Sequence, residues 1–584
     1  MASAKAKTAA STNGHRNGDD PVRAKAGGES PGAGDVLGVL MTDQAAGAAR
    51  RWLPGRDGAK LVGKLATKPG VIAGMGLGYA TQLGRAAMGN GDLEPDKGDQ
   101  RFKDPAWQHN PAFRALCQAY LATDNTVDGL IDAAQLDWHT ERKVRFASRN
   151  VMEAMAPTNF PLLNPTVLKA VVDTGGLNFV KGAQKFVSDM STAPRIPSKV
   201  DTDAFEVGEN LAVTPGKVVL ETEVFELIQY EPTTETVFEV PMLMVPPMIN
   251  KFYIGDISPG RSMIEHFVSK GVQTFTLSWR NPDERHSDWN FDTYARSVID
   301  ALDAVEQITA SAKTHLLGLC AGGQVATATT AHLTAKGQDD RVAGLSLGVC
   351  VLDQDRAGMA GAFVDRPTAA AAIAQSARKG YVDGSALAGV FAWLRPTDLV
   401  WRYWVNNYLL GKEPPKFDVL YWNADATRMA AGLHADFMRL AVENAFVNPG
   451  AFEVLGTPID VSDVTVSTYL VAGISDHISP WRDCYRTTEM LGSEPRFVLS
   501  NSGHIVAMVN PPGSDRASFQ VNDSELPSDP EQWLEGSTEH KGTWWDDWTL
   551  WLSRRSGARV AAPEELGSEE FEPLRDAPGR YVHG

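Results

Sequence analysis

A cysteine at position 320 lies in a pattern that is typical of nucleophilic enzymes. The pattern is Gly318-x-Cys320-x-Gly322, which follows a short apolar stretch and precedes a helix-prone run over residues 325–336. A strand, a sharp turn and a helix with small residues around the turn form a nucleophile elbow, which exposes the central side chain. A thiol is a strong nucleophile and forms a thioester on acylation. The pattern therefore predicts acyl transfer through an acyl-cysteine.

A purely structural role for Cys320 is the competing interpretation. Short glycine-containing patterns arise by chance in a chain with 53 glycines. A free cysteine is also more often a small buried hydrophobic residue than a nucleophile. The strand before the cysteine, the helix after it and suitable partners further along the chain favour the catalytic interpretation.

An acid and a histidine follow Cys320 in the order used by α/β-hydrolases. Residues 466–473 form a predicted strand, and Asp476 lies just after it. Residues 496–499 form the next predicted strand, and His504 follows after a short turn. This order, with each partner just past a strand, is far more specific than the glycine pattern alone. We expect His504 to be the general base for the Cys320 thiol and Asp476 to be its acid partner.

Other histidines and acids compete for these roles. The chain has 12 histidines, and most are expected to be solvated or hydrogen-bonded for structural reasons. His477 is the leading competitor because it adjoins the predicted acid, whereas His286 and His434 lie in no comparable context. Asp460 and Asp463 precede their strand, so we expect them at its opposite end.

An oxyanion hole requires two backbone N–H groups close to the nucleophile. Ala321, the residue after the cysteine, is expected to supply one of them. The loop after the predicted strand 237–245 should supply the other, but it begins with two prolines, which have no N–H. Met248 or Ile249 is therefore the expected second donor.

The elements that must position these residues follow an α/β pattern beyond about residue 213. Helices such as 292–309 lie between strands that we predict at residues 218–223, 224–230, 237–245, 272–278, 315–318, 342–351, 464–471 and 496–499. Strands that alternate with helices indicate a parallel sheet with both faces covered. We predict the α/β class, namely an α/β-hydrolase catalytic domain with a mainly parallel central sheet.

Composition divides the chain into four predicted parts. Residues 1–40 are polar and are expected to be a disordered arm. Residues 41–200 are expected to form a mostly helical N-terminal domain, and residues 201–555 the catalytic domain. Residues 556–584 are acidic and contain proline and glycine, so we expect a flexible tail.

The strand pattern lapses between about residues 355 and 449. This insertion is helix-prone and rich in aromatic residues, among them Trp393, Trp404 and Trp422. It is either a helical subdomain with its own core or a lid whose apolar underside covers a lipophilic substrate. Its place between the nucleophile and the acid favours the lid.

Overall composition narrows the class of protein. The chain has 584 residues, of which 43% are hydrophobic and 22% charged, as in soluble globular proteins with several domains. A formal net charge of -17 argues against a nucleic-acid partner. The 4 cysteines are widely spaced and contain no C-x-x-C pair, so we expect no metal site and reduced thiols.

The sequence was also searched for a signal peptide and for membrane-spanning segments. The N-terminal residues lack the apolar core of a signal peptide. The most apolar stretch, residues 71–80, contains three glycines and is far shorter than the roughly 20 residues that span a bilayer. We therefore expect no transmembrane segment.

From about residue 99 to residue 551 the chain resembles the polyhydroxyalkanoate synthases. The blocks that carry the resemblance are residues 226–232, 245–253, 278–282, 318–323, 405–411, 421–425, 476–481, 502–504 and 544–545. So many blocks in one order argue against a chance match. The resemblance is to the single-subunit synthases of classes I and II.

The resemblance implies an acyltransferase that polymerises (R)-3-hydroxyacyl groups from coenzyme A (CoA) thioesters and releases CoA, without a further cofactor. By motif, Cys320 would hold the growing chain as a thioester and His504 would deprotonate that cysteine. Asp476 would help to activate the incoming 3-hydroxyl group, directly or through His504. Asp256 matches another aspartate of the family, for which we expect a structural role.

The resemblance also implies partners and a location. The expected partners are (R)-3-hydroxyacyl-CoA, the growing polyester, a second copy of the chain in a homodimer, and the granule surface, with granule-associated proteins as further candidates. The expected location is the cytoplasm, on polyhydroxyalkanoate granules. The blocks mix features of short-chain and medium-chain synthases, so both monomer classes stay open.

Two other functions are weighed against the synthase. A thioesterase or polymer-degrading hydrolase on the same scaffold would use water as the acceptor, whereas a synthase must exclude it. The cysteine nucleophile and the aromatic insertion favour the synthase. A non-catalytic granule scaffold would have no need for the ordered Cys320, Asp476 and His504.

Overall fold

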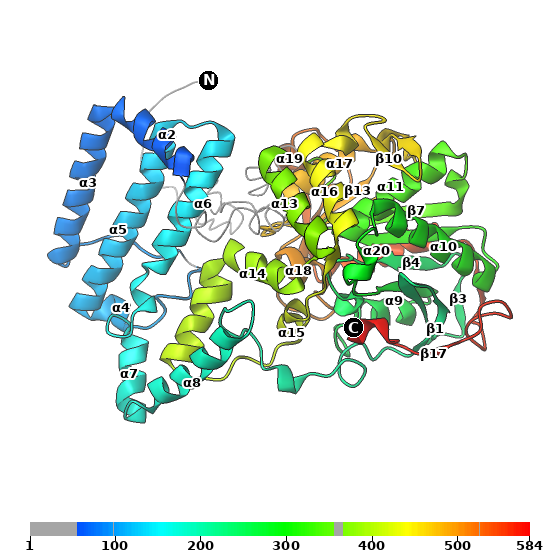
Figure 1. Ribbon diagram of the computed structural model, residues 1–584, viewed down its shortest axis with the longest axis horizontal. Helices are drawn as coiled ribbons and strands as arrows, with labels where there is room; N and C mark the ends of the chain where they lie inside the picture. The colour runs from blue at the N-terminus through cyan, green and yellow to red at the C-terminus, as the bar shows by residue number, and fades with distance from the viewer. Residues whose placement is uncertain (1–54, 97, 355–365, 525) are drawn as a thin grey trace, which may run out of the picture. The chain divides into compact units, whose positions relative to one another are not determined.

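The computed structural model describes residues 55–584 except residues 97, 355–365 and 525. The arm predicted for residues 1–40 therefore lies outside the described residues, as does the start of the predicted insertion. Helices predominate up to residue 191, and an α/β region follows (Figure 1).

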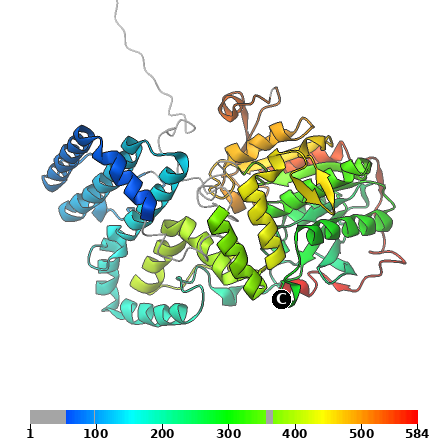
Figure 2. The same ribbon diagram turned by 45° about the horizontal axis from the view of Figure 1, so that its top comes forward.

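The N-terminal region is helical, as predicted. Its helices are α2 (Gly55–Ala66), α3 (Pro69–Ala87), α4 (Ala106–His109), α5 (Pro111–Ala134), α6 (Trp138–Ala154), α7 (Pro165–Thr174) and α8 (Leu177–Ser191). Asn110 and Asn164 each accept backbone N–H groups at a helix start, and a proline follows each of them. The α2 and α3 helices, drawn in blue, pack beside α5 and α6 (Figures 1 and 2). Among the described residues, no helix has the length and apolar character that crossing a bilayer requires.

An 11-stranded sheet forms the centre of the α/β region, in the order β15-β14-β13-β12-β7-β6-β4-β5-β2-β1-β17. The strands are β1 (Gly216–Glu221), β2 (Phe225–Tyr230), β4 (Met242–Val245), β5 (Thr274–Trp279), β6 (Thr314–Leu319), β7 (Val342–Gly348), β12 (Thr468–Gly473), β13 (Arg496–Ser500), β14 (Ser518–Val521), β15 (Thr538–Lys541) and β17 (Arg575–Asp576). Strands β5, β4, β6, β7, β12 and β13 are parallel, and antiparallel strands extend both edges. The predicted α/β-hydrolase fold is confirmed.

Helices cover both faces of this sheet because its strands are apolar on both sides. In β4, Leu243 and Val245 belong to the core cluster that contains residues of α10 (Phe291–Thr309) and α11 (Ala321–Ala335). Met242 and Met244, which point to the other face, belong to the cluster that contains residues of α9 (Met263–Ser269) and α20 (Trp544–Ser553). The sheet is therefore the middle layer of three, as expected for a mainly parallel sheet.

One predicted strand is wrong. Residues 237–245 do not form a single strand but split into β3 (Thr236–Phe238) and β4. The N–H groups of Glu239 and Val240 donate to carbonyl oxygens of residues 558 and 556, and Pro241 has no N–H to donate. Strand β3 therefore pairs with β16 (Arg559–Ala561) outside the central sheet.

The insertion after β7 is helical in its described part. It contains α13 (Arg366–Lys379), β8 (Tyr381–Val382), α14 (Gly384–Leu394), π-helical turns at Thr397–Trp401 and Trp404–Leu409, α15 (Asp418–Ala424), β9 (Met429–Ala430) and α16 (Ala431–Glu443). Two hydrogen bonds join it to the N-terminal helices: Asn178 Nδ2 donates to the Leu409 oxygen at 2.7 Å, and Trp404 Nε1 to the Asn159 oxygen at 3.1 Å. Beyond it lie β10 (Phe452–Val454), β11 (Thr457–Ile459), α17 (Trp481–Met490), α18 (His504–Met508) and α19 (Pro530–Glu535).

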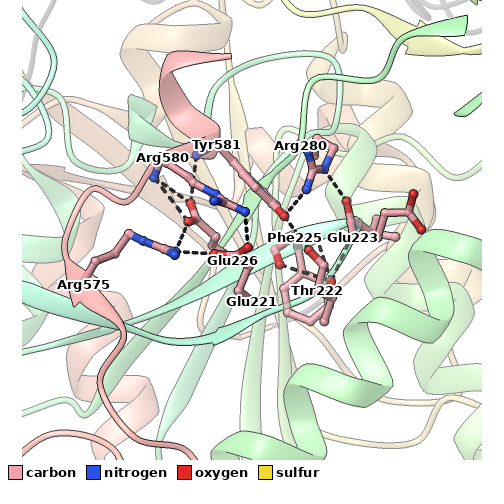
Figure 3. Close-up of polar contacts among 10 residues, drawn as sticks. Glu221, Thr222, Glu223, Phe225, Glu226, Arg280, Arg575, Arg580 and Tyr581 are labelled. Carbon is pink, nitrogen blue, oxygen red and sulfur yellow. Dashed lines mark hydrogen bonds and ion pairs between the residues drawn. The ribbon is translucent and has the colours of Figure 1, made fainter. Parts of the chain in front are cut away.

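The C-terminal segment, residues 575–584, was expected to be flexible but instead lies docked on the sheet edge. Strand β17 pairs with β1, and Tyr581 is buried. Beneath the segment, the fully buried Glu226 carboxylate accepts hydrogen bonds from Arg575 Nη1 at 2.6 Å and from the Tyr581 N–H at 2.9 Å (Figure 3). The Arg280 guanidinium lies over the Tyr581 ring, 4.1 Å from its centroid. Burial of a carboxylate is tolerated only with such partners, so these contacts explain the order of the segment.

Candidate active site

Cys320 occupies the sharp turn between β6 and α11. Its φ of 51° and ψ of -120° are a strained conformation for a residue other than glycine, as expected of a nucleophile elbow. A side chain at Gly322 would place its Cβ 2.2 Å from the Val245 oxygen, so only glycine lets α11 approach β4 this closely. Cys320 is partly exposed, whereas the other cysteines are buried. The position therefore differs from that of a small core residue.

The structure brings Asp476 and His504 together with Cys320. Asp476 follows β12, and His504 is the first residue of α18, just after β13. His504 Nδ1 lies 2.7 Å from Asp476 Oδ2. Because a carboxylate oxygen accepts, Nδ1 carries the proton and the other ring nitrogen is left for the thiol. The second oxygen of Asp476 accepts the backbone N–H groups of Ile478 at 2.7 Å and Ser479 at 2.9 Å, which hold the carboxylate in place.

The electrostatics of His504 favour its protonated form. Burial is the largest single influence and opposes a charge on the ring, but the Asp476 carboxylate and the Cys320 thiol together outweigh burial. Together they raise the pKa of His504 to about 10. The ring can therefore take a proton from a thiol and hold it.

The competing histidines have other surroundings. Burial, with Arg395 and His504 nearby, lowers the pKa of His477 well below its usual value, so this ring is neutral. The Nδ1 atom of His286 accepts the Asp283 N–H at 3.1 Å and caps a helical turn. Burial lowers the pKa of His434 to about 4, and its Nδ1 lies 2.7 Å from Ser376 Oγ.

The competing acids lie away from Cys320 or serve the fold. Asp460 caps the turn Val461–Asp463, which precedes β12, so Asp460 and Asp463 lie at the amino end of that strand as expected. Asp256 is buried and accepts hydrogen bonds from Thr214 Oγ1 at 2.5 Å and Ser262 Oγ at 2.6 Å. These contacts fit the structural role expected for Asp256.

Two of the expected oxyanion donors line one cavity with Cys320. Ala321 and Ile249 border this cavity, whereas Met248 does not. Within the described part of the chain, neither the Ala321 N–H nor the Ile249 N–H donates a hydrogen bond to another backbone group. The next N–H in the loop, that of Asn250, is engaged by the Pro247 oxygen at 3.4 Å. Among the described residues the Met248 N–H donates to no backbone group either, so the place of Ile249 on the cavity wall is what favours Ile249 as the second donor.

The cavity itself is small and covered. Its volume is about 70 Å³, and Trp422 and Asn423 of α15 lie on its wall together with His504. Cavities that bind drug-sized ligands measure roughly 300–1,000 Å³, so this space is too small for a whole acyl-CoA.

A larger cavity lies elsewhere and is not assigned to this chemistry. It has a volume of about 980 Å³ and is bordered by Thr468, Arg496 and Trp551. Thr468 and Arg496 begin β12 and β13, at the edge of the sheet opposite to Asp476 and His504. The smaller cavity is bordered by Cys320 and His504, so we assign the chemistry to it although its volume is smaller.

Several residues around the site were not predicted from the sequence. Lys199 is buried, and its Nζ donates to Asn423 Oδ1 at 2.7 Å. Burial lowers the pKa of Lys199 to about 8. Gln324 and Gln354 also line the cavity. Gln324 lies one helical turn after Cys320, a spacing that could have indicated it; Lys199 carries no such signal, because its partner is 224 residues away.

Known proteins share both parts of this chain. The family profile “Poly-beta-hydroxybutyrate polymerase (PhaC) N-terminus” matches residues 98–267, and the profile “alpha/beta hydrolase fold” matches residues 250–511. The chain is 43% identical over 506 residues to “Poly(3-hydroxyalkanoate) polymerase 2” of Ectopseudomonas oleovorans, covering 87% of this chain and 90% of that relative. It is 39% identical over 491 residues to “Poly(3-hydroxyalkanoate) polymerase subunit PhaC” of Cupriavidus necator, covering 83% of each chain. The chain therefore belongs to the poly(3-hydroxyalkanoate) polymerase family.

Proposed function

We propose that this protein is a polymerase that transfers (R)-3-hydroxyacyl groups from CoA thioesters to a growing polyester through an acyl-cysteine at Cys320. Membership of the polymerase family makes the protein an acyltransferase. The observation that carries the mechanism is the placement of Cys320 and His504 on one cavity at the carboxyl ends of the parallel strands, with Asp476 bonded to His504 behind it.

Acylation begins with transfer of the thiol proton from Cys320 to His504. The sulfur then attacks the carbonyl carbon of the acyl-CoA, the bond from that carbon to the CoA sulfur breaks, and CoA leaves as a thiol with the proton from His504. The N–H groups of Ala321 and Ile249 stabilise the oxyanion of the tetrahedral intermediate. Exchange of one thioester for another is nearly balanced in energy, which suits a sulfur nucleophile.

Elongation transfers the acyl chain from sulfur to oxygen. His504 takes the proton of an incoming 3-hydroxyl group, whose oxygen attacks the thioester carbonyl carbon and forms an ester. The bond from that carbon to the Cys320 sulfur breaks, and the sulfur recovers the proton from His504. Asp476 acts through His504 in this step, because both of its oxygens are engaged by the His504 ring and by backbone N–H groups. This geometry favours the indirect role over direct activation of the hydroxyl group by Asp476.

The helical insertion acts as a lid in this proposal. Trp422 and Asn423 of the insertion lie on the wall of the narrow cavity, where they would limit access of water to a long-lived thioester. A hydrolase on the same scaffold would instead admit water to the acyl-enzyme. The narrow cavity and the family membership support the polymerase over the hydrolase.

Incubation of the protein with (R)-3-hydroxybutyryl-CoA tests the proposal. We expect release of CoA together with an insoluble polyester. Free 3-hydroxybutyrate as the only product would identify a hydrolase instead. A panel of acyl-CoA chain lengths then distinguishes short-chain from medium-chain monomers.

Assembly and location follow from the same proposal. We expect a cytoplasmic homodimer that becomes attached to the surface of its own polymer granules, where granule-associated proteins could join it. Fractionation of polymer-forming cells and size-exclusion chromatography test these expectations. Activity that stays wholly with soluble monomers would contradict them.

A further inference from the structure

Two glutamine side chains on the wall of the active-site cavity have the same unusual arrangement. Gln324 lies in the first turn of α11, and Gln354 follows β7 in the chain. Each side chain is 6% exposed, and both border the cavity that contains Cys320. The two amides therefore belong to different elements but face one space.

One backbone carbonyl orients both amides. Gln324 Nε2 donates to the Val351 oxygen at 2.9 Å, and Gln354 Nε2 donates to the same oxygen at 3.2 Å. A carbonyl oxygen can only accept, so it holds the NH₂ end of each amide and turns away the amide oxygen. In the reverse orientation the amide oxygen would face the Val351 oxygen, and two acceptors would repel each other.

The amide oxygens are left without partners. Among the described residues, neither Gln324 Oε1 nor Gln354 Oε1 has a hydrogen-bond donor, although both atoms are buried. Leaving a buried acceptor without a donor is unfavourable, so two such oxygens beside one nucleophile require an explanation.

We propose that Gln324 and Gln354 form a hydroxyl-binding subsite that accepts a hydrogen bond from the 3-hydroxyl group of the acyl-CoA as it loads onto Cys320. This inference rests on the proposed function and names the substrate group that the site selects. Two acceptor oxygens can receive a hydrogen bond from an O–H group, whereas an acyl chain without a hydroxyl group has no hydrogen to donate to them. An acyl-CoA without the hydroxyl group would leave both oxygens unpaired, which gives strong discrimination.

The amide N–H groups of the pantetheine arm are the other donors that a CoA thioester carries. Gln324 lies one helical turn from Cys320, on the same face of α11, so the subsite adjoins the acyl group rather than the distant arm. A comparison of acyl-CoA substrates with and without the 3-hydroxyl group distinguishes the two donors, because the pantetheine arm is present in both substrates.

The test compares acylation of Cys320 by (R)-3-hydroxybutyryl-CoA and by butyryl-CoA, which cannot be polymerised. The measurement is the rate of the first-turnover release of CoA, from which kcat/KM is obtained for each substrate. We expect the native protein to prefer the hydroxylated substrate by about 100-fold or more. We expect Gln324→Met and Gln354→Met each to reduce this preference by about tenfold, mainly by slowing the hydroxylated substrate.

Gln118→Met is the matched control, because Gln118 is a buried glutamine of the N-terminal helices. It should leave the preference unchanged. The preference is a ratio of two rates of one preparation, so a partly unfolded variant still gives a valid answer. If one glutamine variant fails to fold, the other decides the question.

Three outcomes would contradict the proposed subsite. A native protein that is acylated equally fast by both substrates would overturn the subsite while leaving acyl transfer intact. Unchanged preference in both glutamine variants would overturn it as well. A native protein that releases CoA from neither substrate would refute the proposed function, and the subsite with it.

Discussion

The nucleophile turn and the C-terminal segment are built in opposite ways, although both contact the loop that follows β4. The turn consists of neighbours in sequence: Gly318 and Gly322 surround Cys320, and Gly322 lies against the Val245 oxygen. The C-terminal segment depends on partners hundreds of residues away, such as the ion pair between Arg575 and Glu226.

The C-terminal segment reaches the active site through Lys251. This lysine lies two residues after Ile249, and its Nζ donates to the main-chain oxygen of Gly584. The Lys251 backbone oxygen accepts from Trp422 Nε1 at 2.8 Å, and Trp422 lines the cavity. The comparison teaches that a local motif supplies the reacting atoms, whereas long-range contacts hold the walls around them. Loss of the nucleophile should therefore abolish acyl transfer, whereas loss of the long-range contacts should only lower its rate.

The largest effect is expected from Cys320→Ala. The variant lacks the nucleophile, so release of CoA from (R)-3-hydroxybutyryl-CoA should fall about 1000-fold or more. The fold should persist, because Cys320 is partly exposed. Cys117→Ala, in the N-terminal helices, is the control and should retain activity. Full CoA release by Cys320→Ala would remove the nucleophile turn from the mechanism.

His504→Gln should reduce CoA release by about 100- to 10,000-fold, because the thiol loses its base. It should also change how stability depends on pH. The folded chain holds one proton more than the unfolded chain between the ordinary pKa near 6.5 and the raised pKa of about 10. The contribution of His504 to stability is therefore complete below about pH 6.5 and is lost as the pH rises toward 10.

Thermal unfolding at several pH values measures this contribution. The melting temperature of the native protein should fall more steeply between pH 7 and 10 than that of His504→Gln. Parallel pH profiles would show that the Asp476 contact does not stabilise the protonated ring.

A smaller effect is expected from Gly579→Ala, which acts on the C-terminal segment alone. The residue has a φ of 79°, and an added Cβ would lie 2.5 Å from Glu226 Oε2. The segment should detach, expose Arg575 and Arg580 to trypsin, and lower CoA release about three- to tenfold. Gly513→Ala is the matched control, since its φ is 82° but an added Cβ meets nothing within 4 Å. Equal trypsin resistance and activity in both variants would show that the segment does not support the site.

The smallest effect is expected from Lys199→Met, and it is stabilising. Burial lowers the pKa of Lys199 to about 8, so the folded state disfavours the charge. Below that pH the charged lysine destabilises the fold, and stability should rise with pH from about 8 to the ordinary value of 10.5. Lys199→Met should raise the melting temperature by about 1–3 °C at pH 7 and by less at pH 10. Lys169→Met, on an exposed face of α7, should change nothing.

Short sequence patterns predicted the parallel strands and placed Cys320, Asp476 and His504 at one edge of the sheet. Asp476 and His504 each follow an apolar strand, and the carboxyl ends of parallel strands converge on one edge of a sheet. The break in the predicted strand 237–245 was missed because it depends on pairing with residues 556–558. The flexible tail was predicted from the acidic composition of residues 556–584, which does not reveal that Arg575 and Arg580 pair with Glu221 and Glu226 in distant strands.

By itself, then, the sequence determined the family and the fold, and it predicted the candidate groups: a thiol at a sharp turn, an acid and a histidine, on the parallel strands that carry them. Only the tertiary structure decided that His504 rather than His477 bonds the acid, that the cavity beside Cys320 is narrow, and that Gln324 and Gln354 share the Val351 oxygen. The physical reason is the range of the interactions. Strand periodicity and turn geometry act over a few residues, whereas burial, ion pairing and the orientation of an amide depend on whichever distant groups the fold brings into contact.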